Sequence, residues 1–246
     1  GLHVGRHLGL KMAKSDILVY ADDDIEAFPT WLEAIAESFQ DPEVVLVGGK
    51  NLPKWESDPP DWILKMWVKG RSNKRVVWQL SIIDMGDDIK IISPFNVFGC
   101  NFSIRKKILL EAGGFHPDGM PIDLIRYRGD GETHVCLHVL TSGLITIYNP
   151  SASIYHFVSD NRLTKKYFFA RCFHQGISDS FSFIRKHINR SRIRLSPIFY
   201  LKMIKFLLHA IYMNKVNLLF SLNYVLGFIY HQRLFISDHA VKNWVM

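Results

Sequence analysis

The sequence predicts an α/β protein, and three adjacent segments carry this prediction. Residues 17–20 form a short apolar run that ends at three consecutive aspartates, a pattern typical of a buried strand. From Pro29 to Phe39 the apolar residues recur on one face of a helix. Residues 44–47 form a second apolar run, which stops at two glycines. Strand–helix–strand alternation is typical of α/β sheets, in which ligands collect at the carboxyl ends of strands.

The later segments extend this pattern less regularly. Prolines and tryptophans interrupt residues 51–95, for which we expect an irregular excursion with a short helix. The further predicted elements are a strand over 98–104, helices over 105–112 and 133–142, and a strand over 144–148. We therefore expect two regions, an α/β domain over residues 1–160 and a helical region over residues 161–246.

The chain of 246 residues contains three cysteines, Cys100, Cys136 and Cys172, and no CxxC pair. Their odd number and wide spacing argue against a zinc knuckle or a disulfide framework. We expect reduced thiols in a cytosolic compartment. The sequence opens at Gly1 in the middle of a motif, so we expect a fragment of a longer protein that is cut at its N-terminus.

Basic and apolar residues are concentrated in the C-terminal region. Residues 151–246 contain 14 Lys and Arg against 3 Asp and Glu, whereas residues 1–150 contain 16 against 20. Residues 195–213 and 216–230 are rich in Leu, Ile, Phe and Tyr, but the second run is shorter than the roughly 20 residues that cross a bilayer. We expect helices that lie in an anionic membrane surface, with a buried helical pair and a solvated basic rim as the alternative. The tail has no groove-reading motif, so nucleic acid is not an expected partner.

Three carboxylates follow the first predicted strand. In an extended segment Asp22 and Asp24 point to one side and Asp23 points to the other. Two carboxylates on one side suit a hard divalent cation such as Mg²⁺ or Mn²⁺, which would stabilise the charge of a diphosphate leaving group. The alternative is a solvated acidic turn that starts the next helix.

Four motifs in this order resemble those of glycosyltransferase family 2. They are Gly5-Arg6-His7-Leu8-Gly9 before the strand that ends in the aspartates, Gly99-Cys100-Asn101 with Arg105 and Gly113-Gly114-Phe115, the acidic segment around Glu132, and the Pro150–His156 segment. The resemblance covers roughly residues 1–176. It implies a GT-A fold, a Rossmann-like α/β/α sandwich, in which residues 1–160 are the C-terminal part of the catalytic domain. The strand–helix–strand unit that begins this fold is not in the sequence, so we expect an open sheet edge and an incomplete donor site.

The resemblance also implies site residues on the donor side. Asp24, with help from Asp22, would bind the metal, and Asp23 would approach the donor ribose or sugar. Arg6 would approach the nucleotide or its phosphates, with a surface salt bridge as the alternative. His156 would help to bind the metal or the diphosphate, although a lone histidine is more often a satisfied core or surface residue.

The acceptor side is implied in the same way. Gly99 and Asn101 would line the sugar and acceptor site, and Arg171 would lie on a following helix near the acceptor. Glu132 takes the place of the general base, and Asp130 competes with it for that role. The alternative for both acids is a helix N-terminus with an acidic first turn.

The resemblance implies an enzyme of the hexosyltransferase type, which moves a sugar from a nucleotide-diphosphate sugar to a hydroxyl of a saccharide or lipid-linked acceptor, with inversion. Such an enzyme would serve cell-surface polysaccharide or glycolipid synthesis at the cytoplasmic face of the cell membrane, bound peripherally or monotopically. One alternative is a catalytically degenerate, membrane-bound scaffold. A metal-dependent phosphotransferase is a further alternative, but no phosphate-cradling GxxxxGK[ST] loop is present.

Overall fold

The computed structural model describes residues 2–68, 74–115, 131–187, 204 and 215–245. The chain forms two compact units. Among these described residues, the first unit comprises 2–115 and 131–164, and the second comprises 165–187, 204 and 215–245. Each unit is described separately.

The first unit is built around a five-stranded mixed sheet in the order β1-β8-β3-β9-β7. Its strands are β1 (Ile17–Ala21), β8 (Asn101–Arg105), β3 (Val44–Gly48), β9 (Ile145–Tyr148) and β7 (Lys90–Ile91). β8 lies between β1 and β3 and runs antiparallel to both, whereas β3 and β9 are parallel. The predicted strand–helix–strand unit is confirmed, but its two strands are separated by β8. β1 is an edge strand of this sheet.

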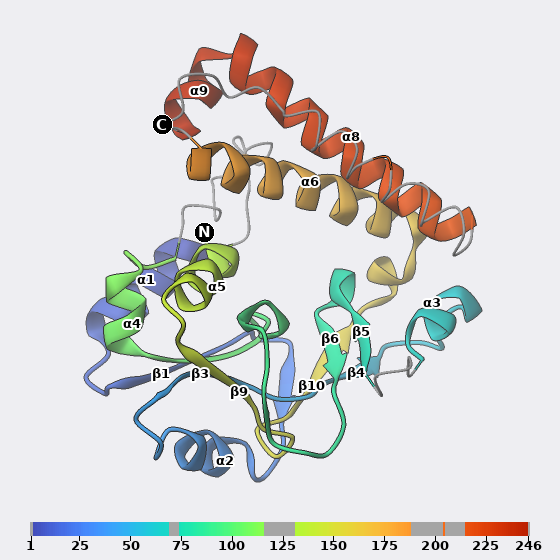
Figure 1. Cartoon of the computed structure of the whole chain (residues 1–246). Helices are drawn as coiled ribbons and strands as arrows, with labels where there is room; N and C mark the ends of the chain where they lie inside the picture. Colours follow the sequence, from blue (N-terminus) through green and yellow to red (C-terminus); the bar gives the residue numbers. More distant parts are fainter. Residues whose placement is uncertain (1, 69–73, 116–130, 188–203, 205–214, 246) are drawn as a thin grey trace. The chain divides into compact units, whose positions relative to one another are not determined.

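Helices cover both faces of this sheet (Figure 1). α2 (Trp31–Ser38) lies on one face, and α1 (Leu2–Met12), α4 (Lys106–Glu111) and α5 (Gly131–Thr141) lie on the other. β3 is buried along its whole length because each face contributes to a core. Val44 and Val47 pack against α2, while Val45 and Leu46 belong to the core on the opposite face. The predicted α/β class is therefore confirmed.

A second five-stranded sheet has the order β2-β10-β4-β6-β5. Its strands are β2 (Ile25–Ala27), β10 (Ile154–Val158), β4 (Asn51–Trp55), β6 (Ile82–Asp84) and β5 (Arg75–Val77). The expectation of an irregular excursion over 51–95 is only partly correct. The short helix is present as α3 (Asp61–Met66), but the segment also supplies β4, β5, β6 and β7. These strands have only two to five residues, which is too short for an alternating pattern to show.

The second unit contains α6 (Lys165–His187), α8 (Lys215–Ser237) and α9 (His239–Val245). α6 and α8 pack along one another, and Gly176 and Gly227 lie at their contact. A Cβ atom at Gly227 would lie 1.9 Å from the carbonyl oxygen of Phe173, so the two backbones approach closely there. The helix that packs against α8 is α6, so the alternative of a buried pair between residues 195–213 and 216–230 stays a prediction. α8 also continues beyond the predicted range of 216–230.

No helix in the described parts of the chain combines the length and apolarity that crossing a membrane requires. The predicted apolar run 195–213 lies outside the described residues, apart from Ile204.

Candidate active site

The three aspartates lie where the chain passes from the first sheet to the second. Asp22 and Asp24 are half-buried, and Asp23 between them is exposed, in agreement with the predicted alternation of sides. The backbone N–H of Phe157 in β10 donates a hydrogen bond of 2.8 Å to the Asp24 carbonyl. This bond holds the carboxylates beside the strand that carries His156.

His156 is buried, and its ring has a defined tautomer. Nδ1 lies 2.9 Å from the Leu80 carbonyl oxygen, which can only accept, so Nδ1 carries the hydrogen. Burial lowers the pKa of His156, and this effect outweighs the opposite effect of the Asp24 charge. The neutral ring therefore presents the lone pair of Nε2 to its surroundings.

Two acceptors consequently face each other. Nε2 of His156 lies 3.4 Å from Oδ1 of Asp24, and none of the described residues donates a hydrogen bond to this buried oxygen. The other carboxylate oxygen of Asp24 is 3.1 Å from the Arg162 guanidinium. A cation between the two acceptors would satisfy both, because neutral imidazole and carboxylate are competent metal ligands. These two groups therefore fit the ligand set of a divalent cation.

Asp22 completes this group of ligands. One ligand atom of Asp22, one of Cys100 and one of His156 lie within 4.8 Å of one another. Burial raises the pKa of Asp22, and the charges of Asp24 and Glu132 act in the same direction, while Arg6 opposes them. A bound cation would relieve this desolvation and repulsion.

Arg6 and Glu132 form an ion pair beside the aspartates. Arg6 projects from α1 and is only 7% exposed, so its salt bridge is interior and not on the surface. Its guanidinium lies 2.7 Å from Oε1 of Glu132, which belongs to the first turn of α5, and 3.9 Å from Oδ1 of Asp22. The guanidinium also stacks over the Phe115 ring, 5.0 Å from its centroid. The structure thus brings two predicted site residues, 126 positions apart, into direct contact.

Gly99 is adjacent to this ion pair. A Cβ atom at this position would lie 1.8 Å from Oε1 of Glu132 and 2.5 Å from a guanidinium nitrogen of Arg6. The absence of a side chain at Gly99 therefore lets the carboxylate of Glu132 occupy its place.

Asn101 has a buried side chain that is engaged within the protein. Its Nδ2 donates to Oδ1 of Asn51 at 3.2 Å and to the Ala152 carbonyl at 2.9 Å, and its Oδ1 accepts from Nε1 of Trp31 at 3.0 Å. These bonds give Asn101 a role in tying β8 to its neighbours. A direct contact with substrate, as the sequence predicted, stays a prediction.

For two predicted site residues the role in this site stays a prediction. Arg171 belongs to α6 in the second unit, and Asp130 lies outside the described residues. Conversely, Cys100 and Arg162 lie at the cluster although no role was predicted for them. Cys100 stands inside the Gly99–Asn101 motif, which was a usable signal, whereas nothing local in the sequence indicates Arg162.

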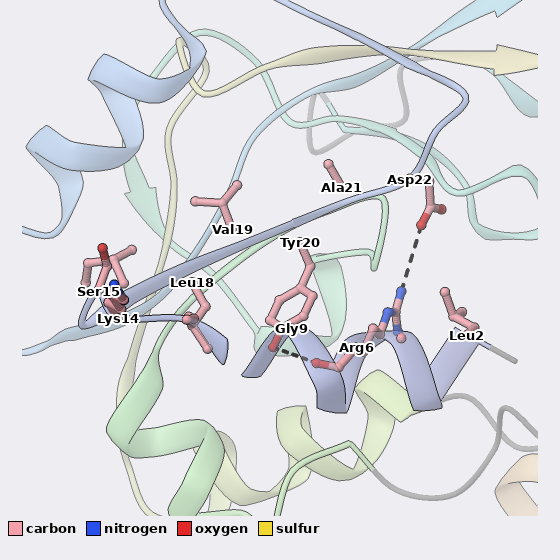
Figure 2. Close-up of a pocket in the computed structure, with 13 residues that line it drawn as sticks. Leu2, Arg6, Gly9, Lys14, Ser15, Leu18, Val19, Tyr20, Ala21 and Asp22 are labelled. Atoms are coloured by element: carbon pink, nitrogen blue, oxygen red, sulfur yellow. Dashed lines mark hydrogen bonds and ion pairs between the residues drawn. The ribbon is translucent and has the colours of Figure 1, made fainter. Parts of the chain in front are cut away.

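A pocket of about 610 Å³ lies between α1 and the edge strand β1 (Figure 2). Arg6 and Asp22 line it at the end of β1, and Lys14 lines it as well. The hydroxyl of Tyr20 donates a hydrogen bond of 3.4 Å to the Arg6 carbonyl, and burial raises the pKa of Tyr20 to about 12. The pocket therefore connects the free edge of β1 with the carboxylate cluster.

The chain is similar to glycosyltransferases. Residues 1–113 match the family described as Glycosyl transferase family 2. Over 181 residues the chain is 25% identical to a glucosyl-dolichyl phosphate glucuronosyltransferase of Haloferax volcanii, with 72% of this chain and 54% of the relative covered. The chain thus spans about half the length of the curated relative that it matches.

Two solved structures are similar at low identity. The mannosyltransferase PcManGT from Pyrobaculum calidifontis, in complex with GDP-Man and Mn²⁺, is 15% identical with a TM-score of 0.49; all of this chain and 62% of that protein are covered. GalNAc-T7 with UDP, GalNAc and Mn²⁺ is 12% identical with a TM-score of 0.40, covering 82% of this chain and 40% of that protein. Neither likeness is close enough to support an argument about the site. The family match is independent of them: residues 1–113 match the model of glycosyl transferase family 2, in agreement with the resemblance that the sequence motifs indicated.

Proposed function

We propose that this chain carries the catalytic centre of an inverting, metal-dependent glycosyltransferase with a GT-A fold. The substrates are a nucleotide-diphosphate sugar and a hydroxyl of a saccharide or lipid-linked acceptor. One observation carries the proposal: the lone pair of His156 Nε2 faces a buried oxygen of Asp24 that accepts no hydrogen bond from the described part of the chain, with Asp22 beside them. Such a set of ligand atoms at the end of β1 suits a divalent cation that would bind the diphosphate of the donor.

Asp22, Asp24 and His156 would hold this cation, either Mg²⁺ or Mn²⁺. When bound, it would neutralise the diphosphate and stabilise the charge of the leaving group. His156 is fixed for this role by the hydrogen bond from Nδ1 to the Leu80 carbonyl, which aims Nε2 at the carboxylates. Arg162 orients Asp24 through its second oxygen. Asp23, exposed between the two ligands, faces solvent and is free to approach the donor sugar or ribose.

Glu132 would act as the general base. Its carboxylate takes the proton of the acceptor hydroxyl as that oxygen attacks the anomeric carbon, and direct displacement of the nucleoside diphosphate inverts this centre. The guanidinium of Arg6 at 2.7 Å positions the carboxylate, and Gly99 leaves room for it. Arg6 therefore acts on the chemistry through Glu132 and Asp22, besides any contact with the donor phosphates.

We further propose that the enzyme works at the cytoplasmic face of an anionic membrane. α8 presents three exposed leucines at helical spacing, Leu219, Leu222 and Leu226. A helix with such a face can lie in a membrane interface. The Haloferax volcanii relative is named for glucosyl-dolichyl phosphate, which supports a lipid-linked acceptor for this chain too.

The test is transfer or hydrolysis of a panel of nucleotide sugars by the purified protein, with and without Mn²⁺. Activity should require the metal and should be lost in Asp24→Ala and in Glu132→Gln. Glu33→Gln is the matched control, because Glu33 is an exposed acid in the first turn of α2. Turnover of no donor, together with unchanged metal binding in Asp24→Ala, would instead favour a catalytically inactive scaffold.

A further inference from the structure

The thiol of Cys100 lies against the metal-binding residues and has no part in the proposed transfer. Cys100 is buried in the turn before β8, and its Sγ, one oxygen of Asp22 and one nitrogen of His156 all lie within 4.8 Å of one another. These three groups offer a sulfur, an oxygen and a nitrogen ligand. They come from three segments that only the fold brings together.

Neighbouring amides hold the sulfur in this place. Nδ2 of Asn51 donates a hydrogen bond to Sγ of Cys100 at 3.3 Å, and Oδ1 of Asn51 is itself fixed by the amide of Asn101 at 3.2 Å. The sulfur also lies 3.9 Å from the Ser81 carbonyl oxygen, a long contact. Hydrogen bonds from outer residues orient metal ligands and tune their affinity, as the Leu80 carbonyl does for His156.

The geometry suits a small tetrahedral ion. With bonds of about 2.0–2.3 Å to oxygen, nitrogen and one sulfur, ligand atoms in a tetrahedron around zinc lie roughly 3.3–3.6 Å apart. Small side-chain rotations therefore close the observed cluster around such an ion. Thiolate is a soft ligand that favours Zn²⁺ and similar ions, whereas Mg²⁺ and Mn²⁺ prefer oxygen.

We propose that Asp22, Cys100 and His156 form a thiophilic metal site that takes Zn²⁺ and competes with the hard cation of the transfer centre. The inference rests on the proposed function, because the two ions share Asp22 and His156. The hard ion uses Asp24 as its further ligand, and the soft ion uses Cys100. On coordination the thiol proton leaves to solvent. Zn²⁺ bound in this way blocks the Mn²⁺ position and inhibits transfer.

The experiment uses Co²⁺ as a spectroscopic substitute for Zn²⁺, together with calorimetric titrations of Zn²⁺ and Mn²⁺ alone. The wild-type protein should show a thiolate-to-cobalt charge-transfer band that is absent in Cys100→Ala and in Cys100→Ser. Cys136→Ala is the matched control, since Cys136 is also a buried thiol of the first unit but is not in the cluster, and it should retain the band. Circular dichroism confirms that each variant is folded.

Cys100→Ala should weaken Zn²⁺ binding by at least about tenfold and change Mn²⁺ binding by less than about threefold. A cobalt complex without a thiolate band, or equal loss of both ions in Cys100→Ala, overturns the inference while the transfer centre stands. Failure of the wild-type protein to bind any of the three ions overturns both the inference and the proposed function.

Discussion

Gly99→Ala is the substitution that most sharply separates the geometry of the site from the stability of the fold. The new Cβ would lie 1.8 Å from Oε1 of Glu132, whereas ordinary van der Waals contact begins at 3.4 Å. The carboxylate must therefore retreat by about 1.6 Å, which is that difference. A misplacement of about 1 Å in a reacting group can lower the rate by about 100-fold, so we expect kcat to fall at least that far.

The stability of this variant should change little. The atoms that the methyl group meets are the ends of the Glu132 and Arg6 side chains, which can rotate away. We expect the free energy of unfolding to fall by about 1 kcal/mol. Gly49→Ala is the matched contrast, because its Cβ would lie 1.8 Å from the backbone carbonyl of Ala152, which cannot rotate away. That variant should lose more than about 2 kcal/mol.

The assays are initial rates of sugar transfer and chemical denaturation of both variants. The reasoning is refuted if Gly99→Ala transfers sugar at the wild-type rate, because Glu132 would then not be a precisely placed base. It is also refuted if Gly99→Ala is destabilised as strongly as Gly49→Ala, since the clash would then not lie at flexible side-chain ends.

Three further predictions concern the metal, the helical unit and its pH dependence. Chelation of divalent ions should abolish transfer and added Mn²⁺ should restore it; full activity after chelation would contradict the metal role. Gly227→Ala should destabilise the α6–α8 pair by about 2 kcal/mol or more in thermal denaturation, since its Cβ would meet the Phe173 carbonyl at 1.9 Å; an unchanged melting curve would count against this contact. Burial holds the pKa of His231 at about 4, below its ordinary 6.5, so the unfolded chain takes up a proton first as pH falls. The contribution of neutral His231 to the stability of the helical unit should therefore be fully present above pH 6.5, and the free energy of unfolding should fall by about 2 kcal/mol between pH 7 and 5. Asp179, whose pKa is raised by burial, has the opposite effect on stability as pH falls. His231→Leu should remove this slope in denaturation at both pH values, and a slope that persists would assign it to other groups.

Local patterns predicted the part of the fold that depends on long apolar runs. The positions of β1, α2 and β3 follow from their apolar runs and hydrophobic periodicity. Only β3 is buried throughout, whereas β1 buries Leu18 alone and is not the fully buried strand that its apolar run predicted, and α2 buries Ala34 and Ile35. The insertion of β8 between β1 and β3 did not follow, because strand order is set by contacts between distant segments. The strands β5, β6 and β7 were not predicted, because two or three residues are too few to show an alternating pattern.

For the site, too, local sequence patterns predicted some residues, whereas contacts between distant segments could not be predicted. Asp22 and Asp24 could be placed together because alternation along an extended segment fixes their side, and the exposure of Asp23 agrees. The salt bridge between Arg6 and Glu132 joins residues whose separation in the chain hides any pairing, and the proximity of Cys100 to His156 likewise arises only in the folded sheet. In the helical region the apolar run over residues 216–230 was visible in the composition, but the contact of α8 with α6 at Gly176 and Gly227 was not.

The proposed function depends above all on Asp24 and His156, which together with Asp22 would hold the cation that serves sugar transfer. The most direct test is a titration of the protein with Mn²⁺ alone, followed by electron paramagnetic resonance of the free ion. We expect one Mn²⁺ per chain in the wild-type protein, binding at least about tenfold weaker in Asp24→Asn and in His156→Ala, and unchanged binding in Asp23→Asn. Equal binding by all four proteins, or no binding by the wild type, would contradict it.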